Sequence, residues 1–266
     1  MDDVYNYNKE RWESLVQQGA LFTKPWLDLD KNSAREKLYL EDVVRDVKEK
    51  RVLCLAGGGG QQSAAFSVLG AKVSVLDISD GQLERDREVA RQYGVDINTV
   101  QGDMRDLSAF DDNSFDLVWH PYSLNFVPSS YDVFKEVARV LRKGGIYHFM
   151  AANPFACGVG TGDWNGEGYI VRQAYQDGSE LTYKDEDWVF KDSGRVKTVQ
   201  GPREYRQTLS TLLNGLIDSG FVLLKVKEFG IGEYDLDAKP GSWDHLVTVM
   251  PPWIKFWVSY RPEITL

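Results

Sequence analysis

The sequence predicts an α/β protein whose core is a mainly parallel sheet. Within residues 51–150, short apolar segments alternate with amphipathic segments that have helical spacing. Parallel strands joined by crossover helices produce this alternation. Two further strands near the C-terminus follow each other without a predicted helix between them, so we expect them to pair antiparallel. The predicted strands are 51–56, 71–77, 97–101, 115–120, 145–151, 221–228 and 245–258.

Capping residues indicate where the two helices that follow the first two strands begin or end. Residues 61–69 have helical spacing and stop before Gly70, a residue type that favours the turn at a helix C-terminus. Ser79 and Gln82 match the S-x-x-Q capping box, which opens a charged helix. We expect that helix to end at Gly94. Two more helices are predicted at 130–141 and 204–219.

The remaining segments differ in composition. The polar N-terminus carries spaced aromatic residues and predicts short helices around a turn at Lys24-Pro25, followed by a helix near 33–49. A later segment is rich in Gly, Asp and aromatic residues and shows no sustained period. We therefore expect an N-terminal helical segment that covers the site (1–50), an α/β domain (51–150 and 201–266) and an inserted β-rich cap (151–200).

Composition excludes several classes of protein. The 266 residues include 31 Lys+Arg and 40 Asp+Glu, and the net charge of −9 disfavours binding to nucleic acid. Cys54 and Cys157 lie far apart, so neither a disulfide scaffold nor a zinc site is predicted. The N-terminus lacks a basic and then apolar leader, and no apolar run approaches the ~18 residues of a membrane span. We expect a cytoplasmic protein without a membrane partner; the sequence gives no oligomeric state.

A glycine-rich turn separates the first strand from the first helix. Such a turn lets a ligand approach main-chain N–H groups, although a tight strand-to-helix connection alone can also require glycine. Gly58, Gly60 and Ser63 occupy the three positions of the dinucleotide-binding fingerprint, with serine in the third. A nucleoside-triphosphate loop is excluded because no Lys-Ser/Thr pair follows the glycines.

Acidic residues follow the second and third strands. Asp77 ends the second strand, where a carboxylate can accept the hydroxyl groups of a ribose or, alternatively, cap the next helix. Asp103 and Met104 follow the third strand, and they suit an adenine amino group and the face of its ring, unless they form an ordinary loop. Because the strands are parallel, these residues and the glycine turn are expected at one edge of the sheet.

Taken together, these segments resemble the class I S-adenosylmethionine-dependent methyltransferases, and within them the small-molecule group that includes the ubiquinone/menaquinone-biosynthesis type. The resemblance implies a Rossmann-like, seven-stranded, mostly parallel sheet with an antiparallel last strand and helices on both faces. It also implies S-adenosyl-L-methionine as cofactor. The segments that carry it are VLCLAGGGG (52–60), VSVLDIS (73–79), QGDMRDL (101–107), FDLVWHPYSLNFV (115–127) and EVARVLRKGGIYHF (136–149).

The resemblance assigns a set of cofactor residues and shows two departures. Cys54 stands where the family usually has an acid, which leaves open how the methionine amino group is held. Ala56 stands where the family usually has glycine, at little cost if its φ is negative. The implied cofactor-binding residues are Ala56, Gly57, Gly58, Gly60, Gln62, Asp77, Ile78, Asp103, Met104 and His120.

The methyl acceptor is expected beside the loop that follows the fourth strand. His120, Tyr122 and Asn125 are the candidate catalytic residues there, with His120 either a general base or a packing residue. The inserted segment predicts a cap with partial acceptor contact, whose acids would favour a cationic or amine acceptor. The alternative is a small antiparallel subdomain that packs on itself and displays a solvated acidic face. Its aromatic residues are Phe155, Trp164, Tyr169, Tyr175, Tyr183, Trp188 and Phe190, and its acids are Asp163, Glu167, Asp185, Glu186 and Asp187.

The sequence therefore predicts transfer of a methyl group from S-adenosylmethionine to a small-molecule acceptor by in-line displacement, which needs alignment more than side-chain chemistry. Two alternatives remain at this stage. The first is an NAD-dependent oxidoreductase, which the serine in the third glycine position and the paired last strands disfavour. The second is a non-catalytic S-adenosyl-nucleotide binder, which Cys54 slightly favours.

Overall fold

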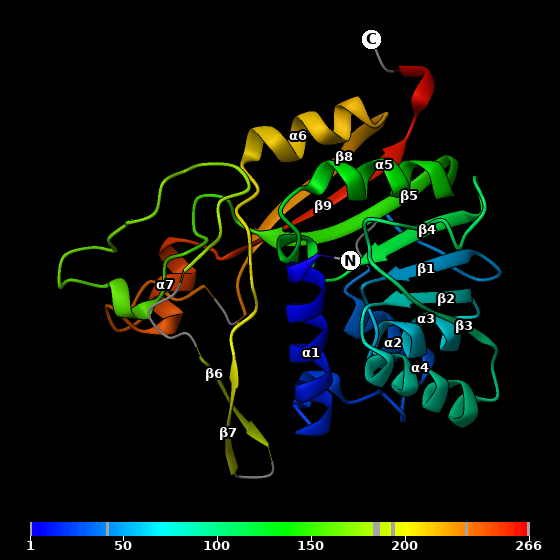
Figure 1. Ribbon diagram of the computed structural model, residues 1–266, viewed down its shortest axis with the longest axis horizontal. Coiled ribbons are helices and arrows are strands. Elements are labelled where there is room, and N and C mark those ends of the chain that lie inside the picture. The colour runs from blue at the N-terminus through cyan, green and yellow to red at the C-terminus, as the bar shows by residue number, and fades with distance from the viewer. Residues whose placement is uncertain (1, 41–42, 183–186, 193–194, 232–233, 265–266) are drawn as a thin grey trace.

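The computed structural model describes residues 2–40, 43–182, 187–192, 195–231 and 234–264, although not the side chains of 187–192 and 195–197. Its main feature is a seven-stranded sheet with the strand order β3-β2-β1-β4-β5-β9-β8 (Figure 1). The strands are β1 (Arg51–Leu55), β2 (Lys72–Asp77), β3 (Ile97–Gln101), β4 (Phe115–His120), β5 (Leu141–Ala152), β8 (Phe221–Phe229) and β9 (Trp253–Tyr260).

Strand direction confirms the predicted fold class. β1 pairs in parallel with both β2 and β4, and the parallel pairing continues to β3 and β5. β9, the last strand of the chain, runs antiparallel to both of its neighbours, β5 and β8. The strand order reverses between β1 and β4, so the connections that leave the carboxyl ends of these two strands run in opposite directions, and ligands bind at such a switch point in open α/β sheets.

Helices cover both faces of this sheet (Figure 1), and each face has its own apolar core. One core joins α5 and α6 to the sheet through residues such as Phe134 and Leu212, and the other joins α2, α3 and α4 through residues such as Phe66 and Leu83. The helices are α1 (Asp3–Gln17), α2 (Lys31–Leu38), α3 (Gln62–Val68), α4 (Asp80–Tyr93), α5 (Ser130–Val140), α6 (Leu209–Asp218) and α7 (Trp243–Val249).

The predicted ends of α4 are confirmed. Ser79 is its N-cap, and the serine Oγ accepts a hydrogen bond of 3.1 Å from the Gln82 main-chain N–H. Gly94 closes the helix in the left-handed conformation with φ 63°. These two ends fix where α4 begins relative to Asp77, the last residue of β2.

The C-terminal prediction is wrong in one part. Residues 245–249 were expected in a strand, but they belong to α7, which lies between β8 and β9. Ser242 starts this helix, because its side chain accepts a hydrogen bond from the His245 N–H. Pro251 and Pro252 then separate α7 from β9, since proline cannot continue a helix. His245 is consequently a half-buried residue of a helix rather than a core residue of a strand.

Two predicted helices are shorter than expected. α2 ends at Leu38 rather than near residue 49, because Tyr39 takes the left-handed conformation with φ 47°. α6 begins only at Leu209, where the side chain of Thr208 caps it. The residues before it are extended and buried, and the Tyr205 N–H donates to the Asn125 carbonyl at 2.7 Å. That contact attaches this segment to the loop after β4.

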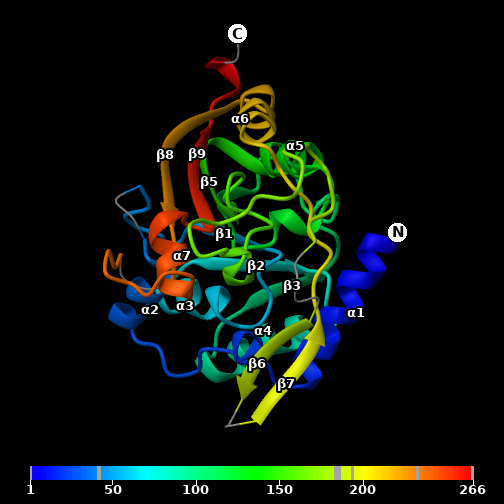
Figure 2. The ribbon, with the colours of Figure 1, turned by 90° about the vertical axis from the view of Figure 1, so that its left-hand side faces the viewer.

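The N-terminal helix packs against the end of the inserted segment. β6 (Asp187–Asp192) and β7 (Arg195–Gln200) form an antiparallel hairpin beside α1, as both ribbon views show (Figures 1 and 2). Arg11 Nε donates to the Gln200 carbonyl at 2.9 Å, and Tyr7 Oη donates to the Gly201 carbonyl at 2.9 Å. The division of the chain into three functional segments remains a prediction. Within the described residues, no helix is long and apolar enough to cross a membrane.

Candidate active site

A cavity of about 480 Å³ lies at the carboxyl ends of the parallel strands. Residues that follow β1, β2, β3 and β4 line it, and α1 adds a further wall. Gly60 and His120 are absent from the lining. The other predicted cofactor residues are all present: Ala56, Gly57, Gly58, Gln62, Asp77, Ile78, Asp103 and Met104.

Asp77 joins the end of β2 to the glycine turn. Its Oδ2 accepts a hydrogen bond of 2.9 Å from the Gly58 N–H, and its Oδ1 accepts one of 2.9 Å from the Ser79 N–H. A Cβ atom at Gly58 would lie 2.9 Å from the Asp77 Cγ, so only glycine allows this approach. Burial raises the pKa of Asp77 to about 6. Each carboxylate oxygen keeps a further lone pair that can accept a ligand hydroxyl group.

Asp86 is a site residue that the sequence analysis missed. It lies on α4 beneath the glycine turn, 0% exposed, and receives hydrogen bonds from Gly59 N at 3.2 Å and Gly60 N at 3.1 Å. Ser63 Oγ makes a further short bond to it. Burial raises the pKa of Asp86 to about 7, and the nearby Asp77 contributes. One signal could have found it: an acid on the apolar side of a helix, three residues from both Leu83 and Val89.

The carboxylates of Asp77 and Asp86 together limit which ligands the glycine turn can bind. The amides of three successive glycines point at acids of the chain itself and are not open to a phosphate. A pyrophosphate would also be repelled by the two buried carboxyl groups, whereas a positively charged sulfonium would be attracted. The structure therefore disfavours a dinucleotide and fits S-adenosylmethionine.

Gln82 supplies a second observation that fits a nucleoside. It lines the cavity beside Asp77, and its Oε1 is buried without a hydrogen-bond donor in the described part of the chain. A buried acceptor without a partner is costly, so a ligand hydroxyl or amino group at this position would stabilise it. The sequence analysis had given Gln82 only a capping role.

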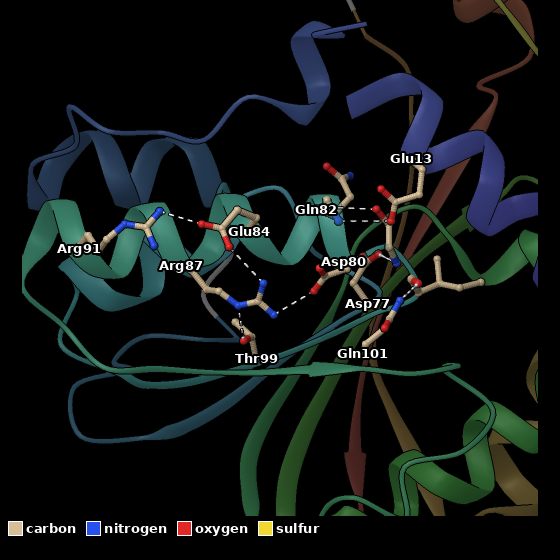
Figure 3. A network of polar contacts seen from close by, with 12 residues as sticks. Glu13, Asp77, Asp80, Gln82, Glu84, Arg87, Arg91, Thr99 and Gln101 are labelled. Carbon is tan, nitrogen blue, oxygen red and sulfur yellow. Dashed lines mark hydrogen bonds and ion pairs between the residues drawn. The ribbon is translucent and has the colours of Figure 1, made fainter. Parts of the chain in front are cut away.

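α1 approaches the start of α4 at the same place. Glu13 Oε1 accepts a hydrogen bond of 3.2 Å from the Gly81 N–H, and Figure 3 shows Glu13 reaching from α1 toward Gln82 and Asp77. Its negative charge contributes to the raised pKa of Asp77. Gln101 Nε2 donates to the Ile78 carbonyl at 3.1 Å and fixes the turn after β2 (Figure 3).

Asp103 lines the cavity but already has a partner. Arg105 Nε lies 3.0 Å from both of its carboxylate oxygens. The same guanidinium group reaches Asp2, just before α1, at 2.7 Å. Asp103 as the acceptor of the adenine amino group stays a prediction. The arginine connects the start of α1 with the loop after β3.

The structure does not bring His120 or Asn125 to the cavity. His120 is 0% exposed, and its ring nitrogens contact Tyr147 Oη at 2.8 Å and Ser123 Oγ at 2.7 Å. Burial lowers the pKa of His120 to about 3, so the geometry favours packing over the general-base hypothesis. Asn125 is occupied by main-chain groups: its Nδ2 donates to the Tyr205 carbonyl at 3.0 Å, and its Oδ1 accepts from the Ala152 N–H at 2.8 Å.

Tyr122 does line the cavity, together with an aromatic cluster formed by Trp12, Phe22 and Phe126. Trp12 on α1 packs edge-on against Phe22 and against Phe126, each with ring centroids 6.1 Å apart. Phe126 in turn packs edge-on against Tyr122 at 5.9 Å. The N-terminal segment thus covers one side of the cavity, and the rings that meet there come from three separate parts of the chain.

The expected acceptor wall of residues 151–200 is not found among the described residues of that segment, none of which lines the cavity. α1 instead forms a wall of the cavity through Val4, Tyr5, Asn8 and Trp12, and β7 packs against this helix. Tyr183, Asp185 and Glu186 lie outside the described residues, as do the side chains of Asp187, Trp188 and Phe190.

Ala56 corrects a further expectation. Its φ is 46°, in the left-handed region, rather than negative. Its N–H donates to the Leu76 carbonyl at 2.7 Å, which holds the residue at the end of β1. An alanine in this conformation is strained by its Cβ atom, so the chain carries a cost here that glycine would avoid.

A mainly parallel sheet with one reversed strand, a glycine turn after β1 and acids after β2 and β3 define a Rossmann-like protein that binds a nucleoside cofactor. Residues 53–149 match the family described as methyltransferase domain. The uncharacterized methyltransferase YbaJ of Bacillus subtilis (strain 168) is 32% identical over 235 residues, which span 84% of this chain and 89% of that protein. The chain therefore belongs to the S-adenosylmethionine-dependent methyltransferases, and S-adenosylmethionine is its methyl donor.

Two other comparisons agree. The demethylmenaquinone methyltransferase of Clavibacter sepedonicus is 41% identical over 103 residues, covering 38% of this chain and 41% of that protein. The crystal structure of a putative S-adenosylmethionine-dependent methyltransferase from Listeria monocytogenes superimposes with a TM-score of 0.62 at 20% identity. That likeness covers 86% of this chain and 98% of the other, and it supports the fold.

Proposed function

We propose that the chain transfers a methyl group to a small-molecule acceptor held at the aromatic end of the cavity. One observation carries the proposal: a single cavity joins the predicted cofactor residues around Asp77 to the rings of Trp12, Tyr122 and Phe126. Its volume of about 480 Å³ lies within the ~300–1,000 Å³ of small-molecule sites. The similarity to a demethylmenaquinone methyltransferase supports an acceptor of this size.

We assign a role to each residue from its position in the cavity lining. Asp77 and Gln82 would hold the nucleoside, and Met104 would cover its ring. Tyr122 and Trp12 would orient the acceptor. When bound, the cofactor supplies a methyl group already activated by its sulfonium charge, so the chain has to align the acceptor and exclude water. Alignment of this kind accounts for about 7–11 kcal/mol of a barrier.

In this proposal, the wall formed by α1 keeps water away from the acceptor. Val4, Tyr5, Asn8 and Trp12 all line the cavity. Asn8 fixes the helix to the rest of the site, because its Nδ2 lies 3.3 Å from the Phe126 carbonyl and its Oδ1 accepts from Arg203 N at 3.2 Å. A cytoplasmic location and the absence of a nucleic-acid partner belong to this proposal as predictions from the sequence.

A panel of amine, hydroxyl, thiol and carbon acceptors, each incubated with S-adenosylmethionine, tests the function. We expect turnover of at least one acceptor, with a KM that rises about tenfold in Trp12→Ala, on the order of one buried aromatic contact. Trp243→Ala is the matched control, because Trp243 is exposed on α7 and does not line the cavity. Tight cofactor binding without turnover across the panel would instead support the non-catalytic binder.

A further inference from the structure

The buried carboxylate of Asp86, on α4, contacts the glycine turn. Its Oδ1 and Oδ2 accept the Gly60 and Gly59 amides at 3.1 and 3.2 Å, and Ser63 Oγ adds a third donor from the first turn of α3. The Gly59 N–H is shared with the Gln82 carbonyl at 3.1 Å. Asp86 does not line the cavity, so any effect on a ligand must pass through the turn.

Gly59 and Gly60 are flexible residues, so the turn needs contacts such as those with Asp86 to hold one conformation. Gly59 and Gly60 have φ of 107° and 71°, and a Cβ atom at Gly60 would lie 2.6 Å from Pro25 and 2.8 Å from the Arg85 carbonyl. Residues of this kind lose the most conformational freedom on folding. The hydrogen bonds that the Gly59 and Gly60 amides donate to one buried carboxylate therefore help to hold both peptide units in orientation.

All three donors stabilise the ionised form of the acid and so oppose burial, which has the larger effect and raises the pKa of Asp86 to about 7. A protonated carboxyl group would turn an O–H toward one of the N–H or O–H donors and lose that bond. The ionisable groups that face Asp86 are Asp77 on β2 and the Cys54 thiol on β1, and neither supplies a positive charge. On α4 itself, the neighbouring Arg85 pairs with Glu88 at 3.3 Å.

The position of Asp86 also bears on the acid that is missing at Cys54. Cys54 is fully buried at the end of β1, and the charge of Asp86 acts on it, so the two side chains lie near each other beneath the turn. The chain thus has an acid, Asp86, near Cys54, but this acid comes from α4 and not from β1.

We propose that Asp86 is a positioning residue: as a carboxylate, it holds the Gly59 and Gly60 amides in the orientation that the cofactor site needs. The proposal rests on the cofactor site described above. Asp86 acts on the ligand through the turn, and Ser63 orients the carboxylate.

Asp86→Asn tests the proposal, with Asp96→Asn as the matched control because Asp96 is exposed beyond the end of α4. Titration calorimetry with S-adenosylhomocysteine at pH 5.5–8.5 measures affinity. We expect roughly 10- to 100-fold weaker binding for Asp86→Asn at pH 8, the range for hydrogen bonds to a charged group, and a smaller loss for Ser63→Ala. Wild-type affinity should fall as the pH decreases through about 7, and this step should be absent in Asp86→Asn, which keeps only the fall near pH 6 that protonation of Asp77 causes. Unchanged affinity, or a loss that keeps the wild-type pH profile, would overturn the proposal.

Amide hydrogen exchange of the free protein provides a measurement that needs no ligand. The Gly59 and Gly60 amides should exchange slowly in the wild type and in Asp96→Asn, and at least tenfold faster in Asp86→Asn and, to a lesser degree, Ser63→Ala. Equal exchange in all four proteins would contradict the positioning role. If the wild type fails to bind S-adenosylhomocysteine, the cofactor site itself is wrong, whereas the exchange rates still decide whether Asp86 holds the turn.

Discussion

Asp77 and Asp86 approach the glycine turn from two elements and share its amides between them. Asp77 at the end of β2 takes the Gly58 N–H at 2.9 Å, and Asp86 on α4 takes the next two. Burial raises the pKa of both acids. The turn is therefore fixed by negative charge within the chain, which suits a cofactor with a positive charge and without phosphate.

Asp77→Asn should weaken S-adenosylhomocysteine binding by roughly 1.5–3 kcal/mol, because the amide group replaces one of the acceptors by a donor. Calorimetry at pH 8 measures the effect. Asp80→Asn, at an exposed position three residues along, should bind like the wild type. Equal affinity of the wild type and Asp77→Asn would remove Asp77 from the binding site.

The stability of the protein should depend on the ionisation of Asp86. Its folded pKa of about 7 lies above the ordinary value of 3.8, so its contribution to stability is complete below pH 4 and is lost as the pH rises through about 7. Relative to Asp86→Asn, the unfolding free energy of the wild type should fall between pH 5 and pH 8, by on the order of 3 kcal/mol. Urea unfolding at several pH values measures this difference. A difference independent of pH would contradict the raised pKa.

His120→Phe should reduce stability and leave the chemistry intact. The substitution leaves Tyr147 Oη and Ser123 Oγ without their buried partner, at a cost of about 1–3 kcal/mol. Because His120 does not line the cavity, kcat should change by less than about threefold. A folded variant whose kcat falls by ~10²-fold or more would restore the general-base hypothesis.

The pH dependence of His120 has the opposite sign to that of Asp86. Its folded pKa of about 3 lies below the ordinary 6.5, so its stabilising contribution is present above pH 6.5 and is lost as the pH falls toward 3. The wild type should therefore lose stability relative to His120→Phe when the pH is lowered from 7 to 4. Thermal unfolding of both proteins across this interval measures the loss.

Ala56→Gly should stabilise the protein by about 1 kcal/mol, because glycine has no Cβ atom to strain the left-handed conformation. For a chain of this size, the melting temperature should rise by roughly 2–4 °C. Ala90→Gly in the interior of α4 is the control, and it should destabilise by about 1 kcal/mol. A lower melting temperature for Ala56→Gly would show that the strain is absent.

Local patterns predicted the parallel sheet, and eight of the ten residues predicted to bind the cofactor line the cavity. The strand at 71–77, the cap at Ser79 and Asp77 follow from short-range rules, and the edge at which they meet follows from strand direction. The sequence predicted one strand over 245–258, whereas the Ser242 cap and the following prolines make residues 243–249 a helix.

Contacts between distant segments could not be predicted. The sequence does not show that α1 packs between β7 and α4, which places Trp12 over the cavity in place of residues 151–200. Asp86 was taken as one more charge on a polar helix, because its three donors come from a different segment. The sign of φ at Ala56 likewise depends on how the turn packs.

The most direct test of the site is a crystal structure of the chain with S-adenosylhomocysteine bound. We expect the nucleoside in the cavity between Asp77 and Met104, with a ribose hydroxyl within hydrogen-bonding distance of the Asp77 carboxylate and the sulfur directed toward Tyr122. A ligand bound elsewhere, or one whose ribose makes no contact with Asp77, would contradict this account.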